Sequence, residues 1–227
     1  SLHDALPIWY IKGGIYMGLR LWKKYSFIIL LIVIGAGFFN TKIAIVAIMC
    51  MLGPIVLAIM GKGRFWCGNI CPRGSFYDSV LKKISSKRPV PRVLKSKIFR
   101  LVVIVFMFYM FGKGLYKNWG NAEGVGLVFY RMIVITTLVG IFLSMFYNHR
   151  SWCNFCPMGT IAAFISRFKR NRKTLKVNSS CMSCKLCQRE CPMGIVPYDY
   201  KGNILSHVDC IQCGDCMRSC PKSSIKY

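Results

Sequence analysis

The spacing of the cysteines near the C-terminal end constrains this chain more than any other feature of its sequence. Two runs share the pattern C-x2-C-x2-C-x3-C-P, with a proline directly after each fourth cysteine. The runs consist of Cys181, Cys184, Cys187 and Cys191, and of Cys210, Cys213, Cys216 and Cys220. In this spacing three thiolates wrap one face of an iron–sulfur cube, while the fourth lies too far along and ligates the other cube. The two runs therefore predict two [4Fe–4S] clusters.

The exchange of the fourth cysteine defines the predicted ligand sets. One cluster takes Cys181, Cys184, Cys187 and Cys220, and the other takes Cys210, Cys213, Cys216 and Cys191. We expect residues 177–227 to form a small α+β ferredoxin-like domain of the bacterial two-cluster type. Metal ligation must stabilise it, because so short a segment buries little apolar core. Zinc ribbons are the alternative, but they do not use four-cysteine runs duplicated with a trailing proline.

Four long apolar stretches precede this domain, at residues 21–39, 43–60, 98–112 and 125–147. A membrane-spanning helix needs roughly 20 apolar residues, and the third stretch reaches that length if it extends to Tyr116. The alternative is a soluble helical bundle, but these stretches are apolar all round rather than along one stripe. The sequence therefore predicts an all-α membrane bundle of four spans over residues 21–176, surrounded by lipid.

Charge is distributed unevenly between the predicted loops. The chain has 32 Lys and Arg against 7 Asp and Glu, and eleven of the basic residues lie between Lys62 and Arg100, whereas Lys42 alone links the first two spans. Basic loops accumulate on the cytoplasmic side of a membrane. We therefore expect an inner-membrane (cytoplasmic-membrane) protein whose termini and ferredoxin-like domain are cytoplasmic. Nucleic-acid binding is not expected, because no recognition helix or aromatic platform accompanies the charge.

A short motif closes each predicted pair of spans. The pattern W-C-x(2 or 3)-C-P-x-G-[ST] occurs at residues 66–75 and 152–160, with three residues between the cysteines in the first copy and two in the second. The repeat predicts two pseudo-symmetric hairpins whose cysteine pairs meet. The four thiols of Cys67, Cys71, Cys153 and Cys156 are candidates for a further metal centre or a redox-active pair. The alternative is that they pack as small hydrophobic side chains where the spans end.

Two segments at the N-terminal end stand apart from this organisation. Residues 1–8, SLHDALPI, lack an initiator methionine and resemble a translated sequencing adapter. We expect them to be a non-native leader, which takes no part in the fold. Residues 9–20 are predicted to be an N-terminal cytoplasmic segment.

The four spans, the paired W-C…C-P motifs and the double cysteine run together resemble the NapH-type membrane ferredoxins. These belong to a wider group of polyferredoxin-like proteins that includes the NosR-type and CcoG-type proteins. The resemblance extends over about residues 21–227. It implies electron relay between membrane quinone and a redox protein or reductase subunit, as a component of a quinol dehydrogenase. A redox-dependent assembly or maturation factor for a metalloenzyme, such as a terminal oxidase, is the alternative role.

Overall fold

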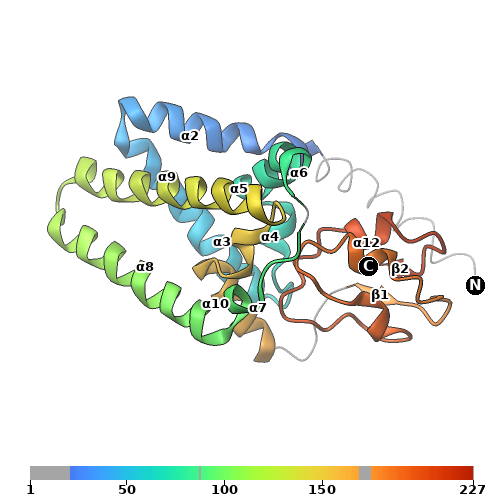
Figure 1. The fold of residues 1–227 in the computed structure, drawn as a ribbon. Helices are drawn as coiled ribbons and strands as arrows, with labels where there is room; N and C mark the ends of the chain where they lie inside the picture. The colour runs from blue at the N-terminus through green and yellow to red at the C-terminus, as the bar shows by residue number, and fades with distance from the viewer. Residues whose placement is uncertain (1–20, 87, 169–174, 227) are drawn as a thin grey trace, which may run out of the picture.

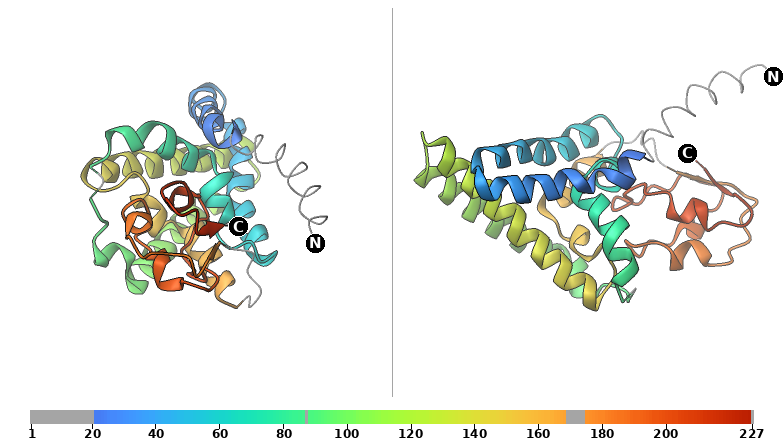
Figure 2. Two further views of the ribbon diagram at one scale, coloured as in Figure 1. Left: turned by 90° about the vertical axis from the view of Figure 1, so that its right-hand side faces the viewer. Right: turned by 90° about the horizontal axis from the view of Figure 1, so that it is seen from above.

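A block of long helices makes up most of the molecule, and a loop-rich C-terminal segment lies at one end of it (Figure 1). The computed structural model describes residues 21–86, 88–168 and 175–226. The expected leader at 1–8 and the segment at 9–20 lie outside the described residues. Figure 2 shows from two further directions that the C-terminal segment packs against the end of the helical block.

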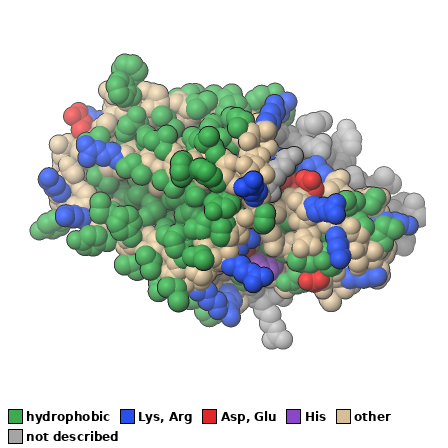
Figure 3. Space-filling view, in the orientation of Figure 1, with side chains coloured by type: hydrophobic (Ala, Val, Ile, Leu, Met, Phe, Trp, Pro, Cys, Tyr) green, Lys and Arg blue, Asp and Glu red, His purple; other side chains and the backbone are tan. Residues whose placement is uncertain are grey.

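Four helices in the described part of the chain are long and apolar enough to cross a membrane. They are Leu21–Phe39, Thr41–Ile59, Lys97–Lys117 and Ala122–Phe146. In the labels of Figure 1, the first includes α2 (Phe27–Phe39), the second joins η2 (Thr41–Val46) to α3 (Ala47–Ile59), and the last two are α8 and α9. Hydrophobic side chains cover the visible face of this block (Figure 3). These helices support the prediction of a membrane protein.

Helices α8 and α9 have opposite surroundings. The side chain of Ser96 caps the start of α8, and none of the residues of α8 is buried, as expected of a helix that faces lipid. Small residues make up most of the buried face of α9, among them Gly126, Thr136, Gly140 and Ser144, and these allow neighbouring backbones to approach closely. The hydroxyl groups of Thr136 and Ser144 donate to backbone carbonyls of the same helix, which satisfies them where water is absent. α9 is therefore the central helix of the block.

Short helices follow each pair of spans. After α3 come α4 (Phe65–Asn69), α5 (Pro72–Phe76), the π-helix η3 (Tyr77–Leu81), α6 (Lys82–Ile84) and α7 (Arg92–Lys95); after α9 come η4 (Ser151–Asn154) and α10 (Pro157–Phe168). The proline of each W-C…C-P motif is the first residue of a helix, Pro72 in α5 and Pro157 in α10. Proline suits this position, because the first turn of a helix leaves its N–H groups without an intrahelical partner. Each motif thus directs the chain from one short helix into another.

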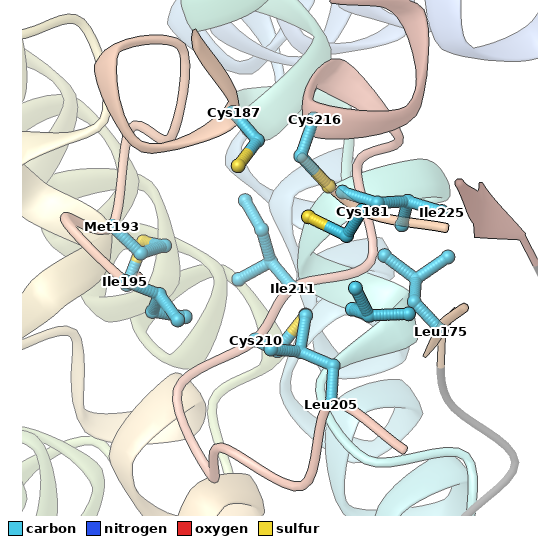
Figure 4. Packing of buried hydrophobic residues seen from close by; sticks show 11 residues of the cluster. Leu175, Cys181, Cys187, Met193, Ile195, Leu205, Cys210, Ile211, Cys216 and Ile225 are labelled. Carbon is cyan, nitrogen blue, oxygen red and sulfur yellow. The ribbon is translucent and has the colours of Figure 1, made fainter. Parts of the chain in front are cut away.

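The C-terminal segment consists of short elements around a compact core. β1 (Lys176–Val177) pairs antiparallel with β2 (Ile225–Lys226), with Val177 opposite Ile225. Between the strands lie α11 (Leu186–Arg189), η5 (Pro197–Tyr200) and α12 (Asp215–Arg218). The core contains Leu175, Val177, Met193, Ile195, Leu205, Ile211, Ile225 and the four buried cysteines of the two runs. In Figure 4, Ile211 lies between the sulfur atoms of Cys181, Cys187 and Cys216 on one side and Cys210 on the other.

Candidate iron–sulfur centres

The two cysteine runs fold as two structurally equivalent repeats. In the first run Ser183 and Lys185 have positive φ angles of 54° and 64°, and in the second Gln212 and Gly214 have 54° and 79°. These left-handed residues turn the chain so that successive cysteines lie around one centre, and glycine adopts this conformation without strain. A four-residue helix, α11 or α12, then carries the third cysteine of each run. Equivalent local conformations thus present equivalent thiols.

The cysteines line two separate pockets. One pocket has an empty volume of about 340 Å³ and is lined by Cys191, Cys210, Cys213 and Cys216. The other has about 320 Å³ and is lined by Cys181, Cys184, Cys187 and Cys220. The fourth cysteine of each run therefore lies in the pocket of the other run, and each pocket holds the four thiols that the spacing assigns to one cluster.

Backbone groups in both pockets suit sulfur that carries negative charge. The N–H of Ile195 donates to Cys191 Sγ and that of Ser224 to Cys220 Sγ, each over 3.4 Å and at equivalent positions of the two repeats. Such hydrogen bonds favour the thiolate form that ligates iron. The remaining lining is mostly apolar, including Leu205 and Ile211. The donor set and its surroundings therefore fit iron–sulfur clusters.

Burial sets the protonation state of these thiols in the absence of metal. It raises the pKa of Cys210 to about 12 and that of Cys213 to about 11, and it also raises the pKa of Cys187 and Cys191. Free thiols at these positions are therefore neutral at physiological pH. Cluster insertion must remove their protons, so metal binding and folding are coupled in this segment.

The two pockets differ in where they lie in the molecule. Cys184 of one pocket is exposed, with Met182 and Leu186 exposed beside it. The other pocket lies against the membrane half, where a Cβ on Gly68 would overlap the carbonyl oxygen of Ile211. Asn69 Nδ2 donates to the carbonyl of Gln212 over 3.1 Å at the same place. One site therefore faces outward and the other faces the first W-C…C-P motif.

The two membrane motifs are joined by a reciprocal exchange of arginines. Arg64 Nη2 donates to the carbonyl oxygen of Cys153 over 2.6 Å, and Arg150 Nη1 donates to that of Cys67 over 2.7 Å. Each arginine precedes the first cysteine of its own copy by the same spacing, R-x-W-C, and reaches the first cysteine of the other copy. Both guanidinium groups are 1% exposed.

The glycine of each motif makes room for the arginine of the other copy. A Cβ on Gly74 would lie 2.7 Å from Arg150 Nη1, and a Cβ on Gly159 would overlap the Arg64 guanidinium. The glycine in C-P-x-G is therefore explained by close approach. The structure thus brings the two motifs together, and arginine side chains bound to backbone carbonyls join them.

Each buried arginine has a carboxylate partner. Arg150 donates two hydrogen bonds of 2.8 Å to the carboxylate of Asp78. Arg64 Nη1 lies 3.0 Å from the carboxylate of Asp209, which also accepts two hydrogen bonds from Arg100. Burial alone would raise the pKa of both aspartates, but Arg150 holds that of Asp78 well below its usual range, and Arg64 and Arg100 lower that of Asp209. Asp78 keeps its ion pair within the membrane half, whereas Asp209 links that half to the C-terminal segment.

These charged residues lie outside the motif predicted from the sequence. The sequence carries a signal for the arginines, since R-x-W-C occurs in both copies, but the predicted motif begins at the tryptophan. No local pattern identifies Asp78 or Asp209 as their partners, because one pair spans 72 positions and the other 145.

Three of the four membrane thiols lie where two packed clusters meet. Cys67 and Cys153 pack against the core of the C-terminal segment, and Cys153 and Cys156 pack with Trp152 and Phe155 in the helical block. Burial raises the pKa of Cys67 to about 12, more than Arg64 lowers it. Among the residues that the structure describes, no three His, Cys, Asp or Glu side chains are grouped to hold a single metal ion. The cysteines of a [4Fe–4S] cube each bind a different iron, so they need not converge on one point. The search for a single-ion site therefore tests mononuclear metal sites only.

Two protein-family models match the chain. A 4Fe-4S binding domain model matches residues 43–91 and 130–174, which include both W-C…C-P motifs. A 4Fe-4S dicluster domain model matches residues 180–225, which include both C-terminal runs. The membrane half, as well as the C-terminal segment, is thus similar to iron–sulfur proteins.

Three curated relatives are similar to this chain. The uncharacterized protein MJ0749 of Methanocaldococcus jannaschii is 29% identical over 150 residues, which is 62% of this chain and 56% of that protein. The uncharacterized protein MJ0750 of the same organism is 28% identical over 69% of this chain and 70% of that protein. The methylamine utilization ferredoxin-type protein MauN of Methylobacillus flagellatus is 26% identical over 63% of this chain.

The chain spans only about half the length of two of these relatives, 56% of MJ0749 and 54% of MauN. No solved structure matches the chain. The paired cysteine pockets, the two 4Fe-4S family models and the ferredoxin-type relative together support an iron–sulfur, ferredoxin-like protein with an electron-transfer function.

Proposed function

We propose that this chain relays electrons between the membrane quinone pool and a redox partner through two [4Fe–4S] clusters. The observation that carries the proposal is the lining of the two C-terminal pockets. Cys181, Cys184, Cys187 and Cys220 would hold one cluster, and Cys210, Cys213, Cys216 and Cys191 the other. When bound, these groups supply one-electron transfer, at potentials that depend on hydrogen bonds to sulfur and on exposure.

The position of each pocket gives the relay a direction. Gly68 lets the backbone of Ile211 approach the first membrane motif, which connects the inner pocket to the helical block. The outer pocket has the exposed Cys184, and basic residues lie beside it at Lys185 and Lys222. A basic rim attracts an acidic partner. We therefore place electron entry from the membrane at the inner pocket and docking of an acidic redox protein at the outer one.

Oxidation of one quinol releases two electrons and two protons. The two electrons match two one-electron centres, and the protons pass to water. The basic loops support a membrane domain at 21–176 in the inner membrane, with the ferredoxin-like domain at 177–227 on the cytoplasmic side.

The four membrane thiols extend the proposal to a further iron–sulfur centre or a redox-active pair. Cys67, Cys71, Cys153 and Cys156 lie in the regions matched by a 4Fe-4S binding model. Replacing Cys67 with Ser should then lower the iron content or slow electron transfer, whereas Cys50→Ser in α3 should do neither. If Cys67→Ser leaves both quantities unchanged, the thiols at this motif only pack.

Anaerobic purification followed by iron and sulfide analysis and EPR tests the main proposal. About eight irons per chain are expected from two clusters, and a reproducible excess would point to the membrane thiols. A quinol in detergent or nanodiscs should reduce the clusters, and a soluble acceptor should reoxidise them repeatedly. Zinc in place of iron would overturn the cluster assignment. Intact clusters that no quinol reduces would overturn the quinone relay, and a single stoichiometric reduction of a client would favour the maturation role.

A further inference from the structure

A third pocket lies in the membrane half, apart from the two cysteine pockets. Its empty volume, which includes the open space at its mouth, is about 480 Å³. Residues of α3, α5, α8 and α9 line it, together with the second W-C…C-P motif. Nothing in the proposed relay accounts for this pocket so far.

The walls of the pocket are apolar and adaptable. Phe108 and Phe111 of α8 and Met132 of α9 form much of the lining. Aromatic rings supply flat contact surface, and methionine fills irregular gaps around a ligand. Phe108 of α8 lines the pocket and is 42% exposed. The pocket therefore borders the hydrophobic exterior of the helical block, from which an apolar ligand would enter.

Two residues that line the pocket carry buried N–H groups. Neither Arg73 Nε nor Trp152 Nε1 has a hydrogen-bond partner among the residues that the structure describes. Trp152 is 6% exposed. A buried donor without an acceptor is unfavourable, and a ligand oxygen would relieve it. The pocket therefore fits a flat apolar molecule with carbonyl or hydroxyl oxygens at one end.

Packing connects this pocket to the inner cysteine pocket. Cys156 lines the membrane pocket, and Trp152 belongs to the same cluster of packed side chains as Cys153. Cys153 in turn packs against the core that contains Cys210 and Ile211. A redox molecule at this position would have a continuous protein path to the predicted cluster ligands.

We propose that this pocket binds the headgroup of a membrane quinone, with Arg73 and Trp152 donating hydrogen bonds to its oxygen atoms. The assignment rests on the proposed quinone relay and adds the place where the quinone binds. It uses Arg73 of the first W-C…C-P motif and Trp152 of the second, so the two copies contribute different residues to one site. Trp66, the equivalent tryptophan of the first copy, also has a buried Nε1 without a partner, but it does not line this pocket.

That asymmetry provides a matched pair of variants for the holoprotein. Trp152→Phe and Trp66→Phe each remove one unpaired N–H and keep an aromatic ring. With menadiol and decyl-ubiquinol as probes, Trp152→Phe should raise the quinol concentration for half-maximal cluster reduction by about tenfold, the loss of one hydrogen bond. Trp66→Phe should leave that concentration unchanged. Iron content and reduction by dithionite should be the same in both variants and the wild type.

A photoreactive azidoquinone gives a second readout that does not depend on electron transfer. It should label peptides containing residues 107–111 or 152–158, and Met132→Trp, which fills the pocket, should abolish the label. Equal responses of the two tryptophan variants, or labelling elsewhere, would overturn the pocket assignment while the quinone relay stands. If the wild type with intact clusters is reduced by neither quinol, the relay itself fails. A pocket that retains a phospholipid acyl chain against excess azidoquinone would also overturn the assignment.

Discussion

The membrane half and the C-terminal segment each contain two copies of a cysteine motif, but the copies exchange different groups. In the membrane half each copy sends an arginine to the other, Arg64 to the carbonyl of Cys153 and Arg150 to that of Cys67. In the C-terminal segment each run places its fourth cysteine in the pocket of the other run. Both exchanges tie two copies into one unit.

The two duplications differ in how closely their copies match. The C-terminal runs have the same spacing and the same left-handed positions, because the proposed cubes impose one geometry on both. The membrane copies differ by one residue between their cysteines, and their arginines use different aspartates. Hydrogen bonds from a guanidinium to backbone carbonyls tolerate such differences. The membrane pair is therefore free to be asymmetric: Gly68 of the first motif meets the backbone of Ile211, and the tryptophan of the second motif, unlike that of the first, lines the membrane pocket.

The largest expected effect comes from breaking the cysteine exchange. Cys191→Ser should remove a ligand from the pocket formed mainly by the second run, because Cys191 lines that pocket. Its EPR spectrum should then match that of Cys213→Ser and differ from that of Cys184→Ser. Loss of the affected cluster would reduce the iron content from about eight to about four per chain.

A Cys191→Ser spectrum that matches Cys184→Ser instead would show that each run ligates its own cluster. Cys220→Ser is the reciprocal control, and it should resemble Cys184→Ser.

Breaking the arginine exchange should cost less and should be unequal. Arg150→Met removes two hydrogen bonds to the buried Asp78 and leaves it Lys23 Nζ at 3.2 Å, which should destabilise the protein by about 3 kcal/mol. Arg64→Met should cost about 2 kcal/mol, because Asp209 keeps two bonds from Arg100. SDS titration of the holoprotein measures both. Equal losses would mean that the two arginines are energetically equivalent despite their different carboxylates.

The strongest sequence patterns predicted the coarse architecture. Uniformly apolar stretches identified four membrane-length helices, since a span must be apolar on every side. The third stretch, predicted at 98–112 with a possible extension to Tyr116, belongs to a helix that runs from Lys97 to Lys117 in the structure. The cysteine spacing grouped the thiols into the same sets that line the two pockets.

The contacts between the two halves could not be predicted from the sequence. Gly68 is one glycine among 20, and only the backbone of Ile211 next to it explains its identity. Asp209 forms ion pairs with Arg64 and Arg100, which lie in separate parts of the chain. The periodicity of the sequence around Asp209 does not predict which residues it pairs with. Patterns report the environment of a segment, whereas these contacts depend on which segments meet.

The close approach at Gly68 gives a prediction of intermediate size. Gly68→Ala places a Cβ where the carbonyl oxygen of Ile211 lies, and backbone cannot move aside as a flexible side chain can. Overpacking of this kind costs roughly 1–3 kcal/mol. We expect faster hydrogen exchange in residues 205–216 and slower reduction of the clusters by quinol.

Gly35→Ala is the matched control, because a Cβ there meets nothing within 4 Å. If both glycine variants behave like the wild type, the C-terminal segment does not pack on the first motif as described.

The smallest expected effect concerns a contact between the halves in which the acceptor is a backbone carbonyl rather than a carboxylate. Lys95 Nζ donates to the carbonyl of Met193 over 2.9 Å, and burial lowers the pKa of this lysine. Lys95→Met should cost about 1 kcal/mol, the net value of a single hydrogen bond, and should leave iron content unchanged. Arg92→Met, on the exposed face of the same short helix, should cost less than half as much. A larger loss for Lys95→Met than for Arg64→Met would reverse the ranking, and docking would then depend on contacts to the loop after Cys191 more than on Asp209.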